Sequence, residues 1–355
     1  MTFDIRSRLP KKVKVTELLL RDGLQHERTL LPTETKIWFY NQIVECGYDI
    51  VEITNFGHPR GVVQTRDAEE LLRKIKRKPG VKLQCYGMNA RAFERCAKIT
   101  QEGFGPDIMA FTISTTDEHS QRNVNKNIKE YLQEIPELVK ISKDNGFECV
   151  MAIACVYGCP INGVVPISKT VELIECGLDM GIRKFIPCDT IGWSNPIRTY
   201  EYMATLVDKF PDVDCHVAHF HESRGMCMAN YFAAIAAGAD VVECSFGALG
   251  GQPAFIVDRI VGVGTGPLYT DSDITGNGST EDVLVMLEEI GVESGVDIDK
   301  VLQLGRILEW VLEKNLPPMS TKSGRIPKSP IKWNKEGTWE FIPPYKEGYW
   351  AFPKY

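Results

Sequence analysis

The chain has 355 residues, of which 43% are hydrophobic and 25% charged, and its formal net charge is −6. This composition is typical of a folded globular protein and argues against a disordered chain. The acidic balance argues against nucleic acid or an anionic membrane as partner, because both favour a basic face, so we expect small-molecule ligands. No apolar run reaches the length of a membrane span and the first residues lack the apolar centre of a signal peptide, which predicts a cytoplasmic protein.

Eight short apolar runs rich in β-branched residues alternate with stretches that have helical spacing. The runs cover residues 13–22, 49–54, 81–87, 107–114, 148–158, 184–190, 215–222 and 241–246. Several of the helical stretches end in a glycine just before the next run, among them Gly47, Gly146 and Gly181. Eight such units predict an α/β fold of the (β/α)₈ TIM-barrel type. An open doubly wound sheet could also hold eight strands, but no GxGxxG follows the first run.

The chain changes character after the eighth run. A glycine-rich stretch covers residues 247–278, two helical patterns lie near 280–290 and 298–314, and residues 316–355 are rich in Pro, Lys, Trp and Tyr. We therefore expect a catalytic barrel over residues 1–300, and over 301–355 a helix and an extension that packs on the barrel or on a neighbouring subunit. The aromatic content argues against a disordered tail. A homo-oligomer, as a dimer, is expected.

The eleven cysteines are scattered from Cys46 to Cys244 without the paired spacing of a zinc module or a short disulfide framework. We expect most of them to be buried free thiols, because free cysteine is among the residue types most often buried.

Polar residues stand near the ends of four predicted strands, where the active site of a TIM barrel lies. They are Arg21, Asp22, Glu52, Asn55, Asp189, His219 and His221. His219 and His221 are two residues apart on a strand, so both imidazoles point to the same face. Asp22 could complete a three-ligand set that leaves positions open for water and substrate, which suits Mg²⁺ or Mn²⁺, although this chemistry alone leaves Fe²⁺ and Zn²⁺ open. Ordinary surface or core histidines are the alternative interpretation of the pair.

Arg21 keeps its proton in a protein, so beside a metal it is suited to hold the negative charge of an enolate or alkoxide. Its alternative role is an ion pair with Glu52. Asp189 could orient a ligand or cap the next helix. His26, His58 and His119 follow the first, second and fourth strands, so any of them could line the pocket, although each taken alone is expected to be a solvated loop histidine.

Six motifs occur in order along the chain: TELLLRDGLQHE (16–27), GCPINGVVP (158–166), DTIGWSNP (189–196), HFHESRG (219–225), GALGGQP (247–253) and GNGSTEDVLVMLEEIG (276–291). Together they resemble the 3-hydroxy-3-methylglutaryl-CoA lyases of the metal-dependent TIM-barrel lyase and synthase superfamily, which is pyruvate carboxyltransferase-like. The resemblance runs from about residue 13 to residue 300.

The resemblance implies roles for particular residues. Asp22, His219, His221 and Asn277 would bind the metal, and Arg21 would stabilise the enolate. Gln25 and Glu52 would contact the substrate or support the ligands. We therefore take Arg21, Glu52 and Gln252 as catalytic candidates and Gln25, Asn55 and Asp189 as binding candidates.

The chain departs from the family pattern at three places. The family's loop reads Gly-Gly-Cys-Pro and its cysteine takes part in catalysis, whereas Gln252 stands here between Gly251 and Pro253. Glutamine cannot act as a general acid or base, so this proton transfer must change or move. The stretch 254–275 is longer than the family's link, which predicts a rebuilt lid. Glu222-Ser223 replaces the family's Asp-Thr, and the synthase branch usually has Asn-Asp there.

These features predict a lyase of the retro-Claisen or retro-aldol type that acts on a 3-hydroxyacyl-CoA or a related hydroxy acid. A first alternative is the same site working in the synthetic direction, condensing an acyl-CoA with a 2-oxo acid. A second alternative is a barrel that kept its metal site for binding and lost the chemistry together with the cysteine.

Overall fold

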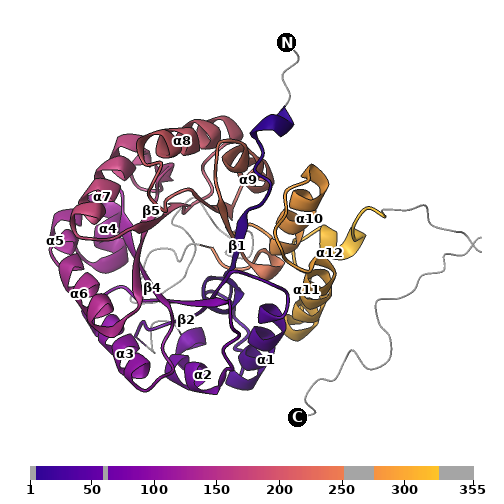
Figure 1. Cartoon of the computed structure of the whole chain (residues 1–355), viewed down its shortest axis with the longest axis horizontal. Coiled ribbons are helices and arrows are strands. Elements are labelled where there is room, and N and C mark those ends of the chain that lie inside the picture. Colours follow the sequence, from indigo (N-terminus) through magenta and orange to yellow (C-terminus); the bar gives the residue numbers. More distant parts are fainter. Residues whose placement is uncertain (1–4, 59–62, 252–275, 328–355) are drawn as a thin grey trace, which may run out of the picture.

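The protein forms a closed barrel of eight parallel strands surrounded by helices, as predicted (Figure 1). A computed structural model describes residues 5–58, 63–251 and 276–327. Each apolar run contains one strand of the ring, and the last strand pairs with the first to close it. In ring order the strands are β1 (Lys14–Glu17), β2 (Ile50–Asn55), β3 (Lys82–Tyr86), β4 (Ile108–Ser114), β5 (Glu148–Ala154), β8 (Lys184–Asp189), β9 (Val217–Glu222) and β10 (Val241–Cys244).

Helices connect the strands on the outside of the ring (Figure 1). They are α1 (Thr33–Val44), α2 (Ala68–Lys74), α3 (Ala90–Gln101), α4 (Asp117–Val124), α5 (Ile128–Leu132), α6 (Ile135–Asn145), α7 (Ile167–Asp179), α8 (Pro196–Lys209) and α9 (Cys227–Ala236). The stretch of helical spacing after the fourth apolar run, residues 126–146, is divided between α5 and α6, because Pro136 has no N–H to bond the carbonyl of Leu132 and stands in the first turn of α6. Gly47, Gly146 and Gly181 all have positive φ, as expected of helix stops.

Smaller elements complete the described chain. They are the 3₁₀ turns η1 (Ile5–Arg8), η3 (Val63–Thr65) and η4 (Phe246–Ala248), the π-helical turn η2 (Leu19–Gly23), the antiparallel pair β6 (Gly158–Cys159) and β7 (Gly163–Val164), and the short strand β11 (Gly276–Asn277). β11 lies antiparallel to the end of β9. The rebuilt lid predicted for 254–275 falls outside the described residues.

The two helical patterns after the barrel strands form α10 (Thr280–Ile290) and α11 (Ile298–Leu312), followed by the single turn α12 (Ser320–Ser323). Figure 1 shows α10 and α11 between α9 and α1, where they complete the outer layer of the barrel. α11 buries Val301 and Leu308 fully. The boundary placed at residue 300 stays a prediction, and the tail beyond residue 327 lies outside the described part of the chain.

The barrel interior is filled by side chains that alternate along the strands. Ile50, Ile108, Val150, Ile186, Val217 and Val241 belong to this inner cluster. Because side chains two apart on a strand share a face, Val217 fixes the direction of His219 and His221, which point inward above it. The larger outer cluster lies between the strands and the helices.

Nine of the eleven cysteines are buried and two are half-buried, and all are free thiols, as expected. None of the helices in the described ranges is long and apolar enough to cross a membrane.

A buried carboxylate ties the end of the barrel to its beginning. Glu17 of β1 accepts hydrogen bonds from the backbone N–H of Leu19 at 2.9 Å and of Phe246 at 3.0 Å. It also accepts one from the hydroxyl of Thr280 at 2.6 Å. Burial raises the pKa of Glu17 to about 7, although these hydrogen bonds lower it. η2, η4 and α10 therefore share one anchor.

Glu281 of α10 makes a second anchor, because its carboxyl group accepts hydrogen bonds from the backbone of Gly247 at 3.0 Å and from the hydroxyl of Ser279 at 3.1 Å. Burial raises the pKa of this group to about 8. At pH values between the ordinary carboxyl pKa and about 8, Glu281 therefore keeps a proton in the folded protein that it has lost in the unfolded chain.

The pH dependence of stability should report this proton. Its contribution to the free energy of unfolding is complete below the ordinary carboxyl pKa and is lost as the pH rises through about 8. Glu281→Gln should make the decline over this window shallower, by at most about 1.4 kcal/mol per pH unit. Urea unfolding at a series of pH values measures the slope; a variant with the same slope as the parent protein would contradict the assignment.

Candidate metal centre and active site

The turn η2 brings Arg21 and Asp22 from the end of β1 over the mouth of the barrel. The turn depends on Gly23, because a Cβ atom there would lie 2.4 Å from the Oγ of buried Ser245. The hydrogen bond from Gly23 N–H to Leu18 C=O closes the wide π turn at 3.0 Å. The motif RDG thus owes its glycine to close packing against Ser245, the residue between β10 and η4.

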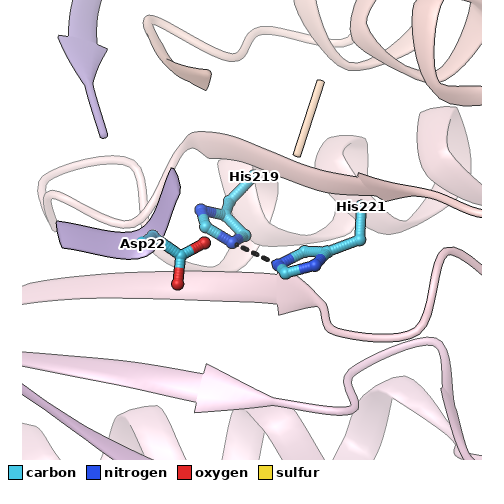
Figure 2. Close-up of side chains that lie close together, drawn as sticks. All are labelled: Asp22, His219 and His221. Atoms are coloured by element: carbon cyan, nitrogen blue, oxygen red, sulfur yellow. Dashed lines mark hydrogen bonds between the residues drawn. The ribbon is translucent and has the colours of Figure 1, made fainter. Parts of the chain in front are cut away.

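Asp22, His219 and His221 form a buried group that could hold a metal ion. One ligand atom from each lies within 4.8 Å of the others. Figure 2 shows both imidazole rings on the same side of β9, with the Asp22 carboxylate beside His219. Although burial raises the pKa of Asp22, Arg21 and the two histidines hold it below its ordinary value, so the carboxylate is charged at neutral pH.

Glu243 of β10 fixes the tautomer of His219. Its Oε2 lies 2.9 Å from Nδ1 of His219. Burial lowers the pKa of His219, but the bond to Glu243 raises it above the ordinary value. With the Nδ1 proton directed at Glu243, the Nε2 atom of neutral His219 presents a lone pair to His221 and Asp22. A carboxylate in this place is common behind histidine ligands of metals.

The position of His221 Nε2 also suits the binding of a cation. The Nε2 atom of His221 lies 3.0 Å from Nε2 of His219, so a proton or a cation must separate the two nitrogens. Burial, followed by the charge of His219, lowers the pKa of His221 to about 3, which favours the neutral ring. Two imidazoles, both neutral once a cation takes the place of the second proton of His219, and a carboxylate are the donor types of a divalent-metal site.

Asn277 of β11 supports the same group from the side. Its Nδ2 donates to Oδ2 of Asp22 at 2.6 Å and to the carbonyl of Leu249 at 3.0 Å. Its Oδ1 is buried and has no hydrogen-bond partner. Asn277 is paired with His221 in the register of β11 and β9. A buried amide oxygen without a donor beside three possible ligands fits a fourth ligand atom.

Arg21 is held on three sides. Its guanidinium lies 2.6 Å from Asp22 and 3.6 Å from Glu52, which confirms the ion pair considered as its alternative role. Its central carbon lies 3.7 Å from the centre of the Tyr86 ring, in a cation–π contact. Burial lowers the pKa of Arg21, but the two carboxylates raise it above the ordinary value, so the positive charge persists.

A cavity of about 250 Å³ opens above the inner cluster of the barrel. Seven of the ten predicted site residues line it: Arg21, Asp22, Gln25, Glu52, Asn55, His219 and His221. Asn277 joins them through its contact with Asp22. Gln252 lies outside the described residues, so its catalytic role stays a prediction.

Asp189 does not line the cavity. Its carboxylate accepts hydrogen bonds from the backbone N–H groups of Trp193 and Ser194, both at 2.9 Å, and so fixes the turn before α8. These contacts are close to the helix-capping role that was one of the two roles expected for Asp189. Its role in binding a ligand stays a prediction.

Three residues were missed in the sequence or misinterpreted. Glu243 and Tyr86 stood inside predicted strands, where a glutamate in an apolar run and a tyrosine near the strand end were the available signals. The expectation of a solvated loop histidine is wrong for His119, which is 1% exposed, and its alternative place in the pocket is confirmed, because it lines the cavity. Its Nδ1 lies 2.7 Å from the hydroxyl of Ser114, so burial in α4 is compensated by a specific partner.

The family model described as HMGL-like matches residues 12–308 of the chain. A hydroxymethylglutaryl-CoA lyase of Bacillus subtilis is 31% identical over 320 residues, which cover 90% of this chain and 99% of that protein. The mitochondrial hydroxymethylglutaryl-CoA lyase of Bos taurus is 29% identical over 305 residues, covering 86% of this chain and 87% of the relative.

Solved structures give the same result. An HMG-CoA lyase from Acinetobacter baumannii, in complex with coenzyme A and 3-methylmalate, superposes with a TM-score of 0.79 at 26% identity, covering 94% of this chain and all of the other. The carboxyl transferase domain of Rhizobium etli pyruvate carboxylase has a TM-score of 0.60 at 14% identity, covering 88% of this chain and 49% of that chain. This second likeness shows a shared fold.

The contact between Glu243 and His219 predicts a change in metal affinity. Glu243→Gln removes the charge that orients the imidazole, and we expect Mn²⁺ binding to weaken about 10-fold to 100-fold. Isothermal titration calorimetry measures the affinity, with Glu137→Gln on the exposed face of α6 as a matched control that should change nothing. Equal affinity in both variants would show that Glu243 does not support a metal ligand.

Proposed function

The chain belongs to the HMGL-like family, and on this basis we propose that it is a divalent-metal-dependent carbon–carbon lyase acting on a 3-hydroxyacyl-CoA or a related hydroxy acid. One observation carries the proposal. Asp22, His219 and His221 lie together at the mouth of the barrel, beside a buried arginine, in a chain whose relatives are hydroxymethylglutaryl-CoA lyases.

We assign the ligand set to Asp22, His219, His221 and the Oδ1 atom of Asn277. Nitrogen and oxygen donors without a thiolate suit Mg²⁺ or Mn²⁺. A divalent cation held there would polarise substrate oxygens and lower the pKa of a 3-hydroxyl group. The buried Oδ1 of Asn277 and the two facing Nε2 atoms support this assignment.

Arg21 holds the negative charge that forms when the carbon–carbon bond breaks. The electron pair of that bond passes to the carbon next to the thioester carbonyl, and the enolate oxygen needs a fixed positive partner. The contacts to Asp22, Glu52 and Tyr86 keep the guanidinium in one place before the reaction, so little reorganisation is needed as the charge develops.

Glu52 is suited to accept the proton of the 3-hydroxyl group. It lines the cavity beside Arg21, and Gln84 donates a hydrogen bond to its Oε1 at 3.2 Å. Burial raises the pKa of Glu52 to about 7, although Arg21 lowers it. A carboxyl group with such a pKa exchanges protons readily near neutral pH. As the proton leaves, the hydroxyl oxygen becomes a carbonyl oxygen and the bond to the α-carbon breaks.

The Acinetobacter relative with bound coenzyme A supports a thioester as substrate. The cytoplasmic location and the homodimer expected from the sequence also remain predictions.

The reaction is tested with protein stripped of metal and resupplied with Mg²⁺ or Mn²⁺. We expect cleavage of at least one member of a panel of 3-hydroxyacyl-CoAs, 3-hydroxy-3-methylglutaryl-CoA included, and no cleavage without the cation. Condensation of acetyl-CoA with a 2-oxo acid, without cleavage of any 3-hydroxyacyl-CoA, would favour the synthase instead. Metal binding without either reaction would favour a barrel that binds and does not catalyse.

Two substitutions should separate metal binding from charge stabilisation. Arg21→Gln should lower kcat about 100-fold to 1,000-fold while the protein still binds Mn²⁺, because the partner of the enolate is lost and all four proposed ligands are kept. His221→Ala should abolish activity and weaken Mn²⁺ binding. His216→Gln, just before β9 and outside the cavity, is the matched control and should behave like the parent protein. Full activity in His221→Ala would show that the site is assigned wrongly.

A further inference from the structure

Cleavage leaves an electron pair on the α-carbon, and a second group must supply a proton to it. The glutamine at position 252 cannot do so, because an amide has no acidic proton near neutral pH. The donor must therefore be sought elsewhere. The assignment of this donor rests on the proposed lyase function, and the candidates are the described residues of the same cavity.

Most titratable groups in the cavity wall already have another role. Asp22, His219 and His221 form the proposed ligand set, and Glu243 is bonded to His219. Glu52 accepts the proton of the hydroxyl group in the proposed reaction. These five groups surround one side of the cavity, near β1, β2, β9 and β10.

Other groups in the described part of the wall hold their protons too firmly. Arg21 keeps its proton, because Glu52 and Asp22 raise its pKa above the ordinary value although burial lowers it. Burial raises the pKa of Tyr86 to about 12, and the hydroxyl is bonded to Thr112 at 2.7 Å. Burial also raises the pKa of Cys188 well above its ordinary value, and its thiol donates to the carbonyl of Ile186.

His119 remains, and its geometry suits the task. It lies in α4 after β4, which stands across the ring from β10 and so faces the proposed metal side. On the His119 side, β4 and β5 contribute the small side chains Ala110, Ala152 and Ala154 to the wall, which leave room for an acyl group. In a cavity of about 250 Å³, a ligand of several carbon atoms that fills the space touches both walls.

Ser114 holds the imidazole in place. Its Oγ lies 2.7 Å from Nδ1 of His119, and both side chains are buried. When Nδ1 carries a proton directed at Ser114, Nε2 is the nitrogen that gains and loses the second proton. Ser114 is therefore a positioning residue for the imidazole.

We propose that His119 is the general acid that protonates the α-carbon of the departing acyl thioester. The hydroxyl proton goes to Glu52, the carbon–carbon bond becomes the electron pair of the enolate, and the imidazolium of His119 gives its proton to the α-carbon. A new C–H bond forms as the N–H bond breaks. One proton is gained by Glu52 and one is lost by His119, so exchange with water restores both groups without any redox partner.

The reverse of this last step gives a direct test. Neutral His119 should remove an α-proton from acetyl-CoA, so the metal-loaded parent protein in D₂O should introduce deuterium into the acetyl group, as mass spectrometry detects. His119→Gln should lower this exchange at least about 100-fold, the usual contribution of a general acid or base. Mn²⁺ affinity should stay unchanged. His216→Gln serves as the matched histidine control and should exchange at the parent rate.

A second variant covers the case in which His119→Gln does not fold. Ser114→Ala keeps the imidazole and removes its partner, so exchange should slow and its pH profile should shift. An unchanged profile in a folded Ser114→Ala protein would contradict the positioning role and the assignment of His119.

The same measurements distinguish a failure of His119 as the acid from a failure of the lyase function. If the parent protein cleaves a 3-hydroxyacyl-CoA while His119→Gln exchanges protons within about threefold of the parent rate, His119 is not the acid and the lyase function stands. If the metal-loaded parent protein neither cleaves nor exchanges, the proposed function fails and this inference fails with it.

Discussion

Closure of the barrel through β10 is the constraint on which the site depends. β10 pairs with β9 on one side and with β1 on the other, so residues from the two ends of the barrel sequence become neighbours. His219 comes from β9, Glu243 from β10 and Asp22 from the turn after β1. The parallel arrangement puts all three at the same end of the ring. The anchors made by Glu17 and Glu281 hold the segments that flank this junction.

Charge balance explains why so many ionisable groups can be buried together. Arg21 is paired with Asp22 and Glu52, and His219 is paired with Glu243. Burying any of these charges alone would cost several kcal/mol. The buried atoms that lack a partner include Nδ1 of His221 and Oδ1 of Asn277. The charged groups of the site are thus paired with one another, while two polar atoms of the proposed ligand residues have no hydrogen-bond partner.

The strands and their order could be predicted from the sequence because each apolar run is separated by a helical stretch, and His219 and His221 could be predicted as a pair because their spacing puts them on one face. Glu243, Tyr86 and His119 could not be assigned in this way. Their roles depend on which strands become neighbours and on the direction of the cavity, which local spacing does not contain. The break between α5 and α6 is caused by Pro136, and the periodicity of apolar residues alone does not predict it.

In the proposed site, two histidines of β9 bind the metal. Pulsed electron paramagnetic resonance of the Mn²⁺-loaded protein labelled with ¹⁵N-histidine measures this contact. We expect hyperfine couplings from the nitrogens of His219 and His221, with one of them lost in His221→Ala. A protein that binds Mn²⁺ without any coupling to histidine nitrogen would contradict it.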